Sequence, residues 1–150
     1  MTILEELLGS PGLYLGIDAV SDTEYQGAAR LVVTPLPGAA GVALDYEIFN
    51  PATPENVRGH VEHTMLVRAG DGSVRMVIAH PHASSAAILR ETEPGTFEPD
   101  GAEPFPMKVV VSMSSDGKLR HAWWYGRPGG EAVERDVSIL ERVTEASPRR

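Results

Sequence analysis

Residues 107–125 read MKVVVSMSSDGKLRHAWWY, and they place two strand-like segments on either side of Asp116-Gly117. Glycine supplies the positive φ angle that tight hairpin turns require, so this stretch predicts two antiparallel strands joined at that dipeptide. From Gly12 onward, the chain continues to alternate short segments rich in Val, Ile, Tyr, Trp and Thr with Gly- and Pro-containing turns. We therefore expect a fold built from hairpins.

The strands that this pattern predicts lie between turn signals, with no helical segment between them. They span residues 13–20, 25–34, 42–49, 57–68, 73–80, 85–92, 96–98, 107–114, 118–125 and 132–142. Strands at this spacing indicate an antiparallel sandwich or an up-and-down barrel. Closure removes exposed strand edges, so we predict an all-β fold, an antiparallel up-and-down β-barrel of about ten strands.

A short helix is predicted ahead of the strands. Residues 3–8, ILEELL, carry apolar side chains at helical spacing, and Gly9-Ser10-Pro11-Gly12 ends the pattern. Two helical turns are too short to be stable alone, so we expect residues 1–10 to cap the barrel. A length of 150 residues is typical of one domain, and we predict a single barrel domain over 1–150 with a flexible tail at 144–150.

Composition excludes several classes of function. The formal net charge is −8, whereas binding to phosphate backbones needs clustered Lys and Arg, so no nucleic-acid partner is expected. The chain has no cysteine, which excludes disulfides, thiolate metal sites and cysteine nucleophiles. No apolar run reaches the roughly 20 residues of a membrane span, and the first six residues lack the positive charge that begins a signal peptide. We expect a cytoplasmic protein.

One face of each strand must line the interior, because side chains alternate between the two faces. Turning the more apolar face inward leaves a few polar side chains inside, as is typical of a small-molecule pocket. The ligand-binding residues predicted in this way are Tyr46, His63, Met65, Met76, His80, His121, Trp123, Tyr125, Arg135 and Val137. A register error of one residue inverts any of these faces.

Four of the five histidines lie within residues 60–82, but their spacing argues against a shared metal ion. On a strand, the HxxH spacing of His60 and His63 sends the two rings to opposite faces. His60 and Glu62 share a face, and two interpretations stay open: a solvated pair outside the barrel, or a functional pair.

The second pair, His80-Pro81-His82, surrounds a proline that marks a strand end. A metal ion there would need further ligands, which only His63 or His121 could supply from the inward faces. We predict no metal site, and we treat His82 as a semi-exposed loop residue. Catalytic residues are not predicted either, because the chain has no GxSxG elbow.

Four stretches resemble parts of known barrels. GLYLG (12–16) resembles a degenerate GxWxG opening of calycin barrels, the lipocalin and fatty-acid-binding group. HVE (60–62) followed by VIAHPHASSAAILRE (77–91) resembles the nitrobindin family, in which a His-x-Glu strand precedes an Ala-His-Pro turn. VERDVSILERV (133–143) resembles the closing strand of that family. The resemblance covers most of the chain in order.

This resemblance implies a ten-stranded barrel whose best-known members bind haem, with His80 on the distal side of the pocket. This chain differs from the family at two positions. Arg135 or Asp136 stands where the family has its iron-ligating histidine on the closing strand, and Tyr14 replaces the usual Trp. Arginine offers no lone pair to iron. No cofactor is therefore expected, and the resemblance predicts the fold rather than haem chemistry.

The function predicted from these features is binding of a small, largely apolar ligand with a polar or acidic head, fatty-acid-like, in the barrel. Arg135 would pair with a ligand carboxylate, or with an acidic residue of the chain itself. Haem binding through His63, His80 or His121 is one alternative, and an enzyme with a pocket histidine as general acid or base is another, although binding is preferred. Outward Trp124 indicates either a homodimer contact or packing under the N-terminal cap.

Overall fold

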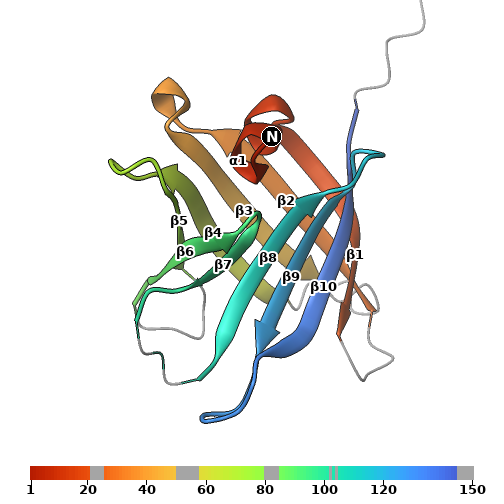
Figure 1. The fold of residues 1–150 in the computed structure, drawn as a ribbon. Coiled ribbons are helices and arrows are strands. Elements are labelled where there is room, and N and C mark those ends of the chain that lie inside the picture. Colours follow the sequence, from red (N-terminus) through yellow and green to blue (C-terminus); the bar gives the residue numbers. More distant parts are fainter. Residues whose placement is uncertain (21–25, 50–57, 80–84, 102, 104, 145–150) are drawn as a thin grey trace, which may run out of the picture.

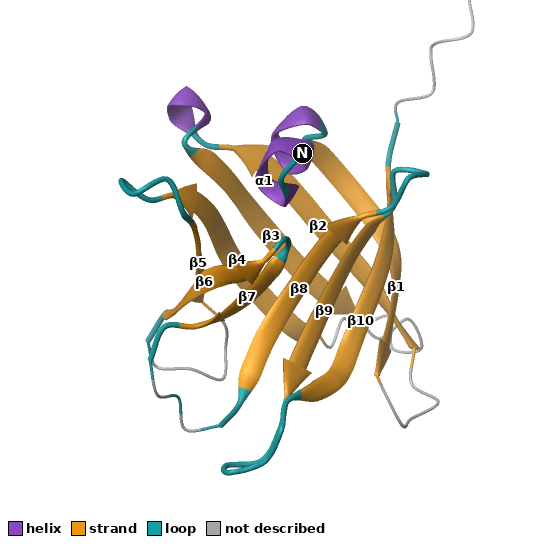
Figure 2. Cartoon of the chain, in the orientation of Figure 1, coloured by secondary structure: helices purple, strands orange, loops and turns teal. Residues whose placement is uncertain are grey.

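The computed structural model describes residues 1–20, 26–49, 58–79, 85–101, 103 and 105–144. These residues form a closed barrel of ten antiparallel strands with a short N-terminal α-helix (Figures 1 and 2), so the predicted fold class is confirmed. The elements are α1 (Ile3–Gly9), β1 (Gly12–Val20), β2 (Gln26–Pro35), the 3₁₀-helix η1 (Pro37–Ala39), β3 (Gly41–Phe49), β4 (Arg58–Arg68), β5 (Val74–Ala79), β6 (Ala87–Glu93), β7 (Thr96–Pro99), β8 (Met107–Met113), β9 (Leu119–Tyr125) and β10 (Val133–Arg142).

Each strand pairs with the next one in the chain, and β1 pairs with β10 to close the barrel. Gly16 lies at this closing seam, opposite Leu140. A Cβ atom at residue 16 would lie 1.8 Å from the carbonyl oxygen of Ile139, so the close approach of the two strands requires glycine at this position.

The helix α1 covers one end of the barrel (Figure 1), as predicted. Thr2 begins it with a capping box, in which its hydroxyl accepts a hydrogen bond from the Glu5 amide and the Glu5 carboxylate accepts one from the Thr2 amide. Ile3, Leu4 and Leu7 are buried against the strands. Within the described ranges, no helix has the length and apolar character needed to cross a membrane.

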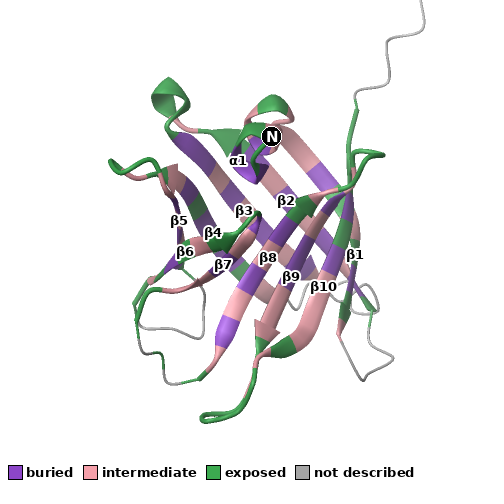
Figure 3. Ribbon diagram, viewed as in Figure 1, coloured by how far each residue is buried: buried purple, intermediate pink, exposed green. Residues whose placement is uncertain are grey.

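The barrel interior changes character along its axis. Near α1 it is filled by apolar side chains, among them Leu31, Leu44, Leu66, Leu119 and Leu140, all at most 1% exposed. Figure 3 shows buried residues along the strands, alternating with less buried ones. Arg68 contacts Glu5 of α1, so β4 runs from the far end of the barrel toward the helix. The inward residues of β4 that lie farther from the helix than Leu66 are Thr64 and Glu62, and both are polar. The end opposite α1 is therefore where a site can form.

Two strands present the face opposite to the one predicted. On β4, Glu62, Thr64 and Leu66 are buried, whereas the side chain of His63 is 67% exposed. Met65 is exposed as well, so the prediction that His63 and Met65 face the interior is wrong. Both faces of this strand carry apolar residues, and the more apolar one lies outside.

On β10 the same inversion has a local cause. A β-bulge between Glu134 and Asp136 shifts the pairing with β9, so that Asp136, Ser138 and Leu140 face inward. Val133 is opposite the inward Tyr125, so alternation without a bulge would also turn Arg135 and Val137 inward, as predicted. The bulge inverts the residues beyond it. The predicted inward orientation of Val137 is therefore wrong.

Candidate functional site

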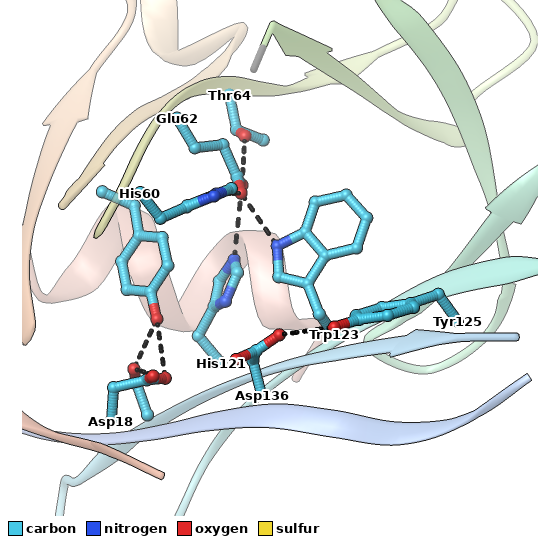
Figure 4. A network of polar contacts seen from close by, with 10 residues as sticks. Asp18, His60, Glu62, Thr64, His121, Trp123, Tyr125 and Asp136 are labelled. Atoms are coloured by element: carbon cyan, nitrogen blue, oxygen red, sulfur yellow. Dashed lines mark hydrogen bonds and ion pairs between the residues drawn. The ribbon is translucent and has the colours of Figure 1, made fainter. Parts of the chain in front are cut away.

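Polar side chains from five strands converge in the half of the barrel away from α1 (Figure 4). They are Asp18 of β1, Tyr46 of β3, His60, Glu62 and Thr64 of β4, His121, Trp123 and Tyr125 of β9, and Asp136 and Ser138 of β10. We call this set the interior polar network. Alternation along each strand brings its members inward, and barrel closure brings β1, β9 and β10 opposite β3 and β4.

Glu62 is the centre of one half of the network. Its side chain is fully buried, and its carboxylate accepts hydrogen bonds from Thr64 at 2.9 Å, His60 at 3.0 Å and the Trp123 indole at 2.8 Å. Nε2 of His121 lies 3.6 Å from the same carboxylate. Burial alone would raise the pKa of Glu62, but the contacts with His121 and His60 outweigh it and hold the pKa well below its usual range. Glu62 is therefore a buried carboxylate whose lone pairs are largely used within the protein.

Asp18 is the centre of the other half. Its Oδ1 atom accepts hydrogen bonds from the Ser138 hydroxyl at 2.9 Å and the Tyr46 hydroxyl at 3.3 Å, and Tyr46 also contacts Ser138. Ser138 is directly opposite Asp18 across the closing seam. Burial raises the pKa of Asp18 and also that of Tyr46, which the Asp18 charge raises further.

His121 connects the two halves. Its ring stacks on Tyr46 with centroids 4.5 Å apart, and in Figure 4 it lies between Glu62 and the carboxyl groups of Asp18 and Asp136. The side chains of His121 and Asp18 are almost completely buried. Within the described part of the chain, four buried side-chain atoms have no hydrogen-bond partner: Nδ1 and Nε2 of His121, Oδ2 of Asp18 and, on the outer face of β9, Nε1 of Trp124. Nε2 of His121 is directed at Glu62, which leaves Nδ1 and Oδ2 as the two network atoms that lack a polar partner, and buried polar atoms are nearly always paired with protein, water or ligand.

Solvent reaches the network from the end opposite α1. The His60 side chain is 20% exposed and Tyr125 is 38% exposed. The Tyr125 hydroxyl donates a hydrogen bond to Oδ2 of Asp136 at 3.3 Å, and burial raises the pKa of Asp136. This half of the interior also contains apolar side chains, among them Ile48, Ile78 and Met107. It thus combines apolar surface with polar groups.

The predicted ligand-binding residues are only partly brought together. Tyr46, His121, Trp123 and Tyr125 belong to the interior polar network, and Met76 is buried in the apolar core. His63, Met65 and Val137 are on the outer face, where His63 pairs with Asp45. Arg135 is at the β10 bulge, with Nε 3.5 Å from the Tyr125 carbonyl oxygen and the guanidinium 5.9 Å from the Tyr125 ring. The predicted roles of His80 and His82 fall outside the described residues.

Several network residues were not predicted as ligand-binding. Asp18 shares its face of β1 with the buried Tyr14, whereas Asp136 and Ser138 become inward only through the bulge. Glu62 shares a face with Thr64 and Leu66, and this face was expected outside because it is the less apolar of the two. The predicted opposite orientation of His60 and His63 is confirmed, and so is the contact between His60 and Glu62, although this pair is inside the barrel.

The outward orientation of Trp124 is also confirmed, and the Lys108 ammonium lies 4.2 Å from the centroid of its ring. Within the described residues, no group of three or more His, Asp or Glu side chains is arranged to hold a metal ion.

No family model matches this chain. A search of curated proteins also returned no match. The fold is consistent with a calycin-like barrel, whereas the closer resemblance to nitrobindins stays a prediction.

Proposed function

We propose that this chain binds a small, largely apolar molecule inside the barrel, with the polar head of that molecule at the interior polar network. The observation that carries the proposal is the pair of buried, unpartnered atoms, Oδ2 of Asp18 and Nδ1 of His121. Leaving a buried polar atom unpaired costs about 1–3 kcal/mol, so a head group that pairs with both atoms gains binding energy there.

The surroundings of these atoms support a ligand with an apolar body. Ile48, Ile78 and Met107 are inward-facing apolar residues toward the end opposite α1, and Trp123 adds a large, partly exposed ring. Pockets for small molecules combine such surface with a few fixed polar groups. The half near α1 is already filled by the core, so the ligand enters from the opposite end.

Haem is a poorer fit to the described histidines. His63 is outside the barrel, and His121 directs Nε2 at Glu62 while its ring face is covered by Tyr46. An iron ligand needs a nitrogen with open space along its axis for the porphyrin, and Nδ1 of His121, although it has no partner, belongs to a ring that is only 1% exposed. The described histidines therefore favour another kind of ligand over haem.

A catalytic role is less well supported than binding. Glu62 accepts three hydrogen bonds and has a lowered pKa, which makes it a weak proton acceptor. Its contacts instead indicate that it holds His60, His121 and Trp123 in place.

Native mass spectrometry of the protein as purified, beside a denatured control, tests the proposal. We expect a mass excess that disappears on denaturation, and a smaller excess in His121→Phe, which removes Nδ1 but keeps a ring against Tyr46. Asp45→Asn, a change on the outer face, serves as the control. The proposal is wrong if no excess is found and no compound from a panel of apolar amines, alcohols and acids raises the melting temperature.

A further inference from the structure

The charge of the interior polar network indicates which head group it accepts. The network contains three carboxyl groups, those of Asp18, Glu62 and Asp136, and two imidazoles, but no lysine or arginine. Arg135 is at the bulge beside Tyr125, with its Nε atom 3.5 Å from the Tyr125 carbonyl oxygen and its guanidinium 5.9 Å from the Tyr125 ring. A ligand carboxylate placed among these groups would meet negative charge.

The three carboxyl groups differ in how far the protein compensates them. Glu62 accepts three hydrogen bonds and faces His121. Asp18 has a buried oxygen without a partner, and Asp136 receives the Tyr125 hydroxyl at 3.3 Å. Asp18 and Asp136 are therefore the carboxyl groups with capacity for a further donor.

These two groups are close enough to share one ligand atom. Asp18 is opposite Ser138 and Val20 is opposite Asp136, so both aspartates face inward on adjacent strands in a diagonal arrangement. Diagonal neighbours on paired strands are about 7–8 Å apart at their Cα atoms, a separation that two aspartate side chains can span around one small cation. Burial is the main cause that raises the pKa of Asp18, and the nearby charge of Asp136 raises it further.

Aromatic rings complete the surroundings. Tyr46 reaches Asp18 with its hydroxyl, and Tyr125 reaches Asp136. Trp123 lies between Glu62 and the pair of Tyr125 and Asp136 (Figure 4). The face of an aromatic ring attracts a cation, more strongly when the site is shielded from water. Carboxylates and aromatic faces together are the chemistry that recognises an organic ammonium group.

We propose that the head group of the ligand is an organic ammonium, held between Asp18 and Asp136 and bordered by Trp123 and Tyr125. This inference rests on the proposed function and replaces the fatty-acid-like head expected from the sequence. The ammonium donates one hydrogen bond to the free oxygen of Asp18 and another to Asp136, while its apolar body lies toward Met107 and Ile48.

Calorimetric titration with three compounds that share a body tests this directly: 4-phenylbutylamine, 4-phenylbutanol and 4-phenylbutanoate. We expect the amine to bind at least about tenfold more tightly than the alcohol, because charge-assisted hydrogen bonds are about twice as strong as neutral ones, and the acid to bind most weakly. Equal affinity of alcohol and amine, or tighter binding of the acid, overturns the inference.

Asp18→Asn is the matching variant. Asparagine keeps the oxygen that accepts from Ser138 and Tyr46 but removes the charge, so the variant should lose the preference for the amine over the alcohol. Asp45→Asn makes the same change of net charge on the outer face and should leave the preference intact. An unchanged preference in Asp18→Asn contradicts the proposal.

The outcomes separate this inference from the proposed function. Binding of the alcohol or the acid without a preference for the amine leaves small-molecule binding standing and removes the ammonium. If none of the three compounds binds, the ammonium inference fails, and the native mass spectrum decides on binding by itself.

Discussion

Replacing Glu62 by glutamine should destabilise the protein strongly, although the side chain keeps its shape. The pKa of Glu62 is lowered in the folded protein despite complete burial, so the fold stabilises the carboxylate more than water does. Glutamine resembles the protonated form. The amide oxygen can still accept from His60 and Trp123, whereas the amide NH2 group can only donate toward Thr64, so all three contacts now involve a neutral group and each is weaker by about 1 kcal/mol. The total loss of unfolding free energy is about 3 kcal/mol, in the range measured for broken buried ion pairs.

Urea unfolding followed by far-ultraviolet circular dichroism at pH 7 measures this loss. Glu47→Gln is the matched control, because Glu47 is on the outer face of β3, 3.9 Å from Arg30, and an ion pair of this kind is worth less than about 1 kcal/mol. The difference between wild type and Glu62→Gln should shrink as pH falls below about 4.3, where glutamate of the unfolded chain takes up a proton while folded Glu62 stays ionised. A loss no larger than that of the control would refute an ionised Glu62 at the centre of the network.

Further predictions concern stability. Asp18→Asn should raise the melting temperature more at pH 8 than at pH 4, because the pKa of Asp18 is raised on folding and its ionisation disfavours the native state; thermal denaturation at both pH values checks this. Leu7→Ala should cost about 3 kcal/mol in urea unfolding, since Leu7 is fully buried, whereas Glu6→Ala should cost less than about 0.5 kcal/mol. Gly16→Ala should cost about 3 kcal/mol by forcing the closing strands apart, while a Cβ at Gly9 contacts nothing within 4 Å; equal effects of these two substitutions would contradict the closure.

The strands and turns could be predicted because their signals are local. Gly72, Gly95, Gly117 and Gly129 all adopt the positive φ angles that the predicted turns require. Strand bounds agree within two residues wherever the structure describes them. The number of strands and the absence of long helices then favoured a closed barrel, which the pairing of β1 with β10 confirms.

The face of β4 could not be predicted from polarity. A glutamate on a strand is expected to face solvent, and two of the residues that stabilise Glu62 inside the barrel, His121 and Trp123, are about 60 residues away in sequence. The prediction placed His63 and Met65 inside the barrel because their face of the strand is the more apolar one. Such a face is decided by long-range pairing rather than by the strand itself.

The inward face of β10 was predicted wrongly because the strand contains one extra residue, a β-bulge. A bulge has no strong sequence signal, yet it moves Arg135 out of the ladder and turns Asp136 and Ser138 into the barrel. This single shift changes the character of the interior, because it exchanges a predicted cation for a carboxyl group. The charge inferred for the head group of the ligand therefore changes from negative to positive.

The most direct test of binding at the interior polar network uses the two tryptophans of the chain, one on each face of β9. Trp123 donates its indole hydrogen to Glu62 inside the barrel, whereas Trp124 is outside beneath Lys108. In a ¹H–¹⁵N spectrum assigned with Trp124→Phe, titration with 4-phenylbutylamine should shift the Trp123 indole signal and leave that of Trp124 in place. A shift of Trp124 alone, or of neither signal at saturating amine, would contradict a ligand site at the network.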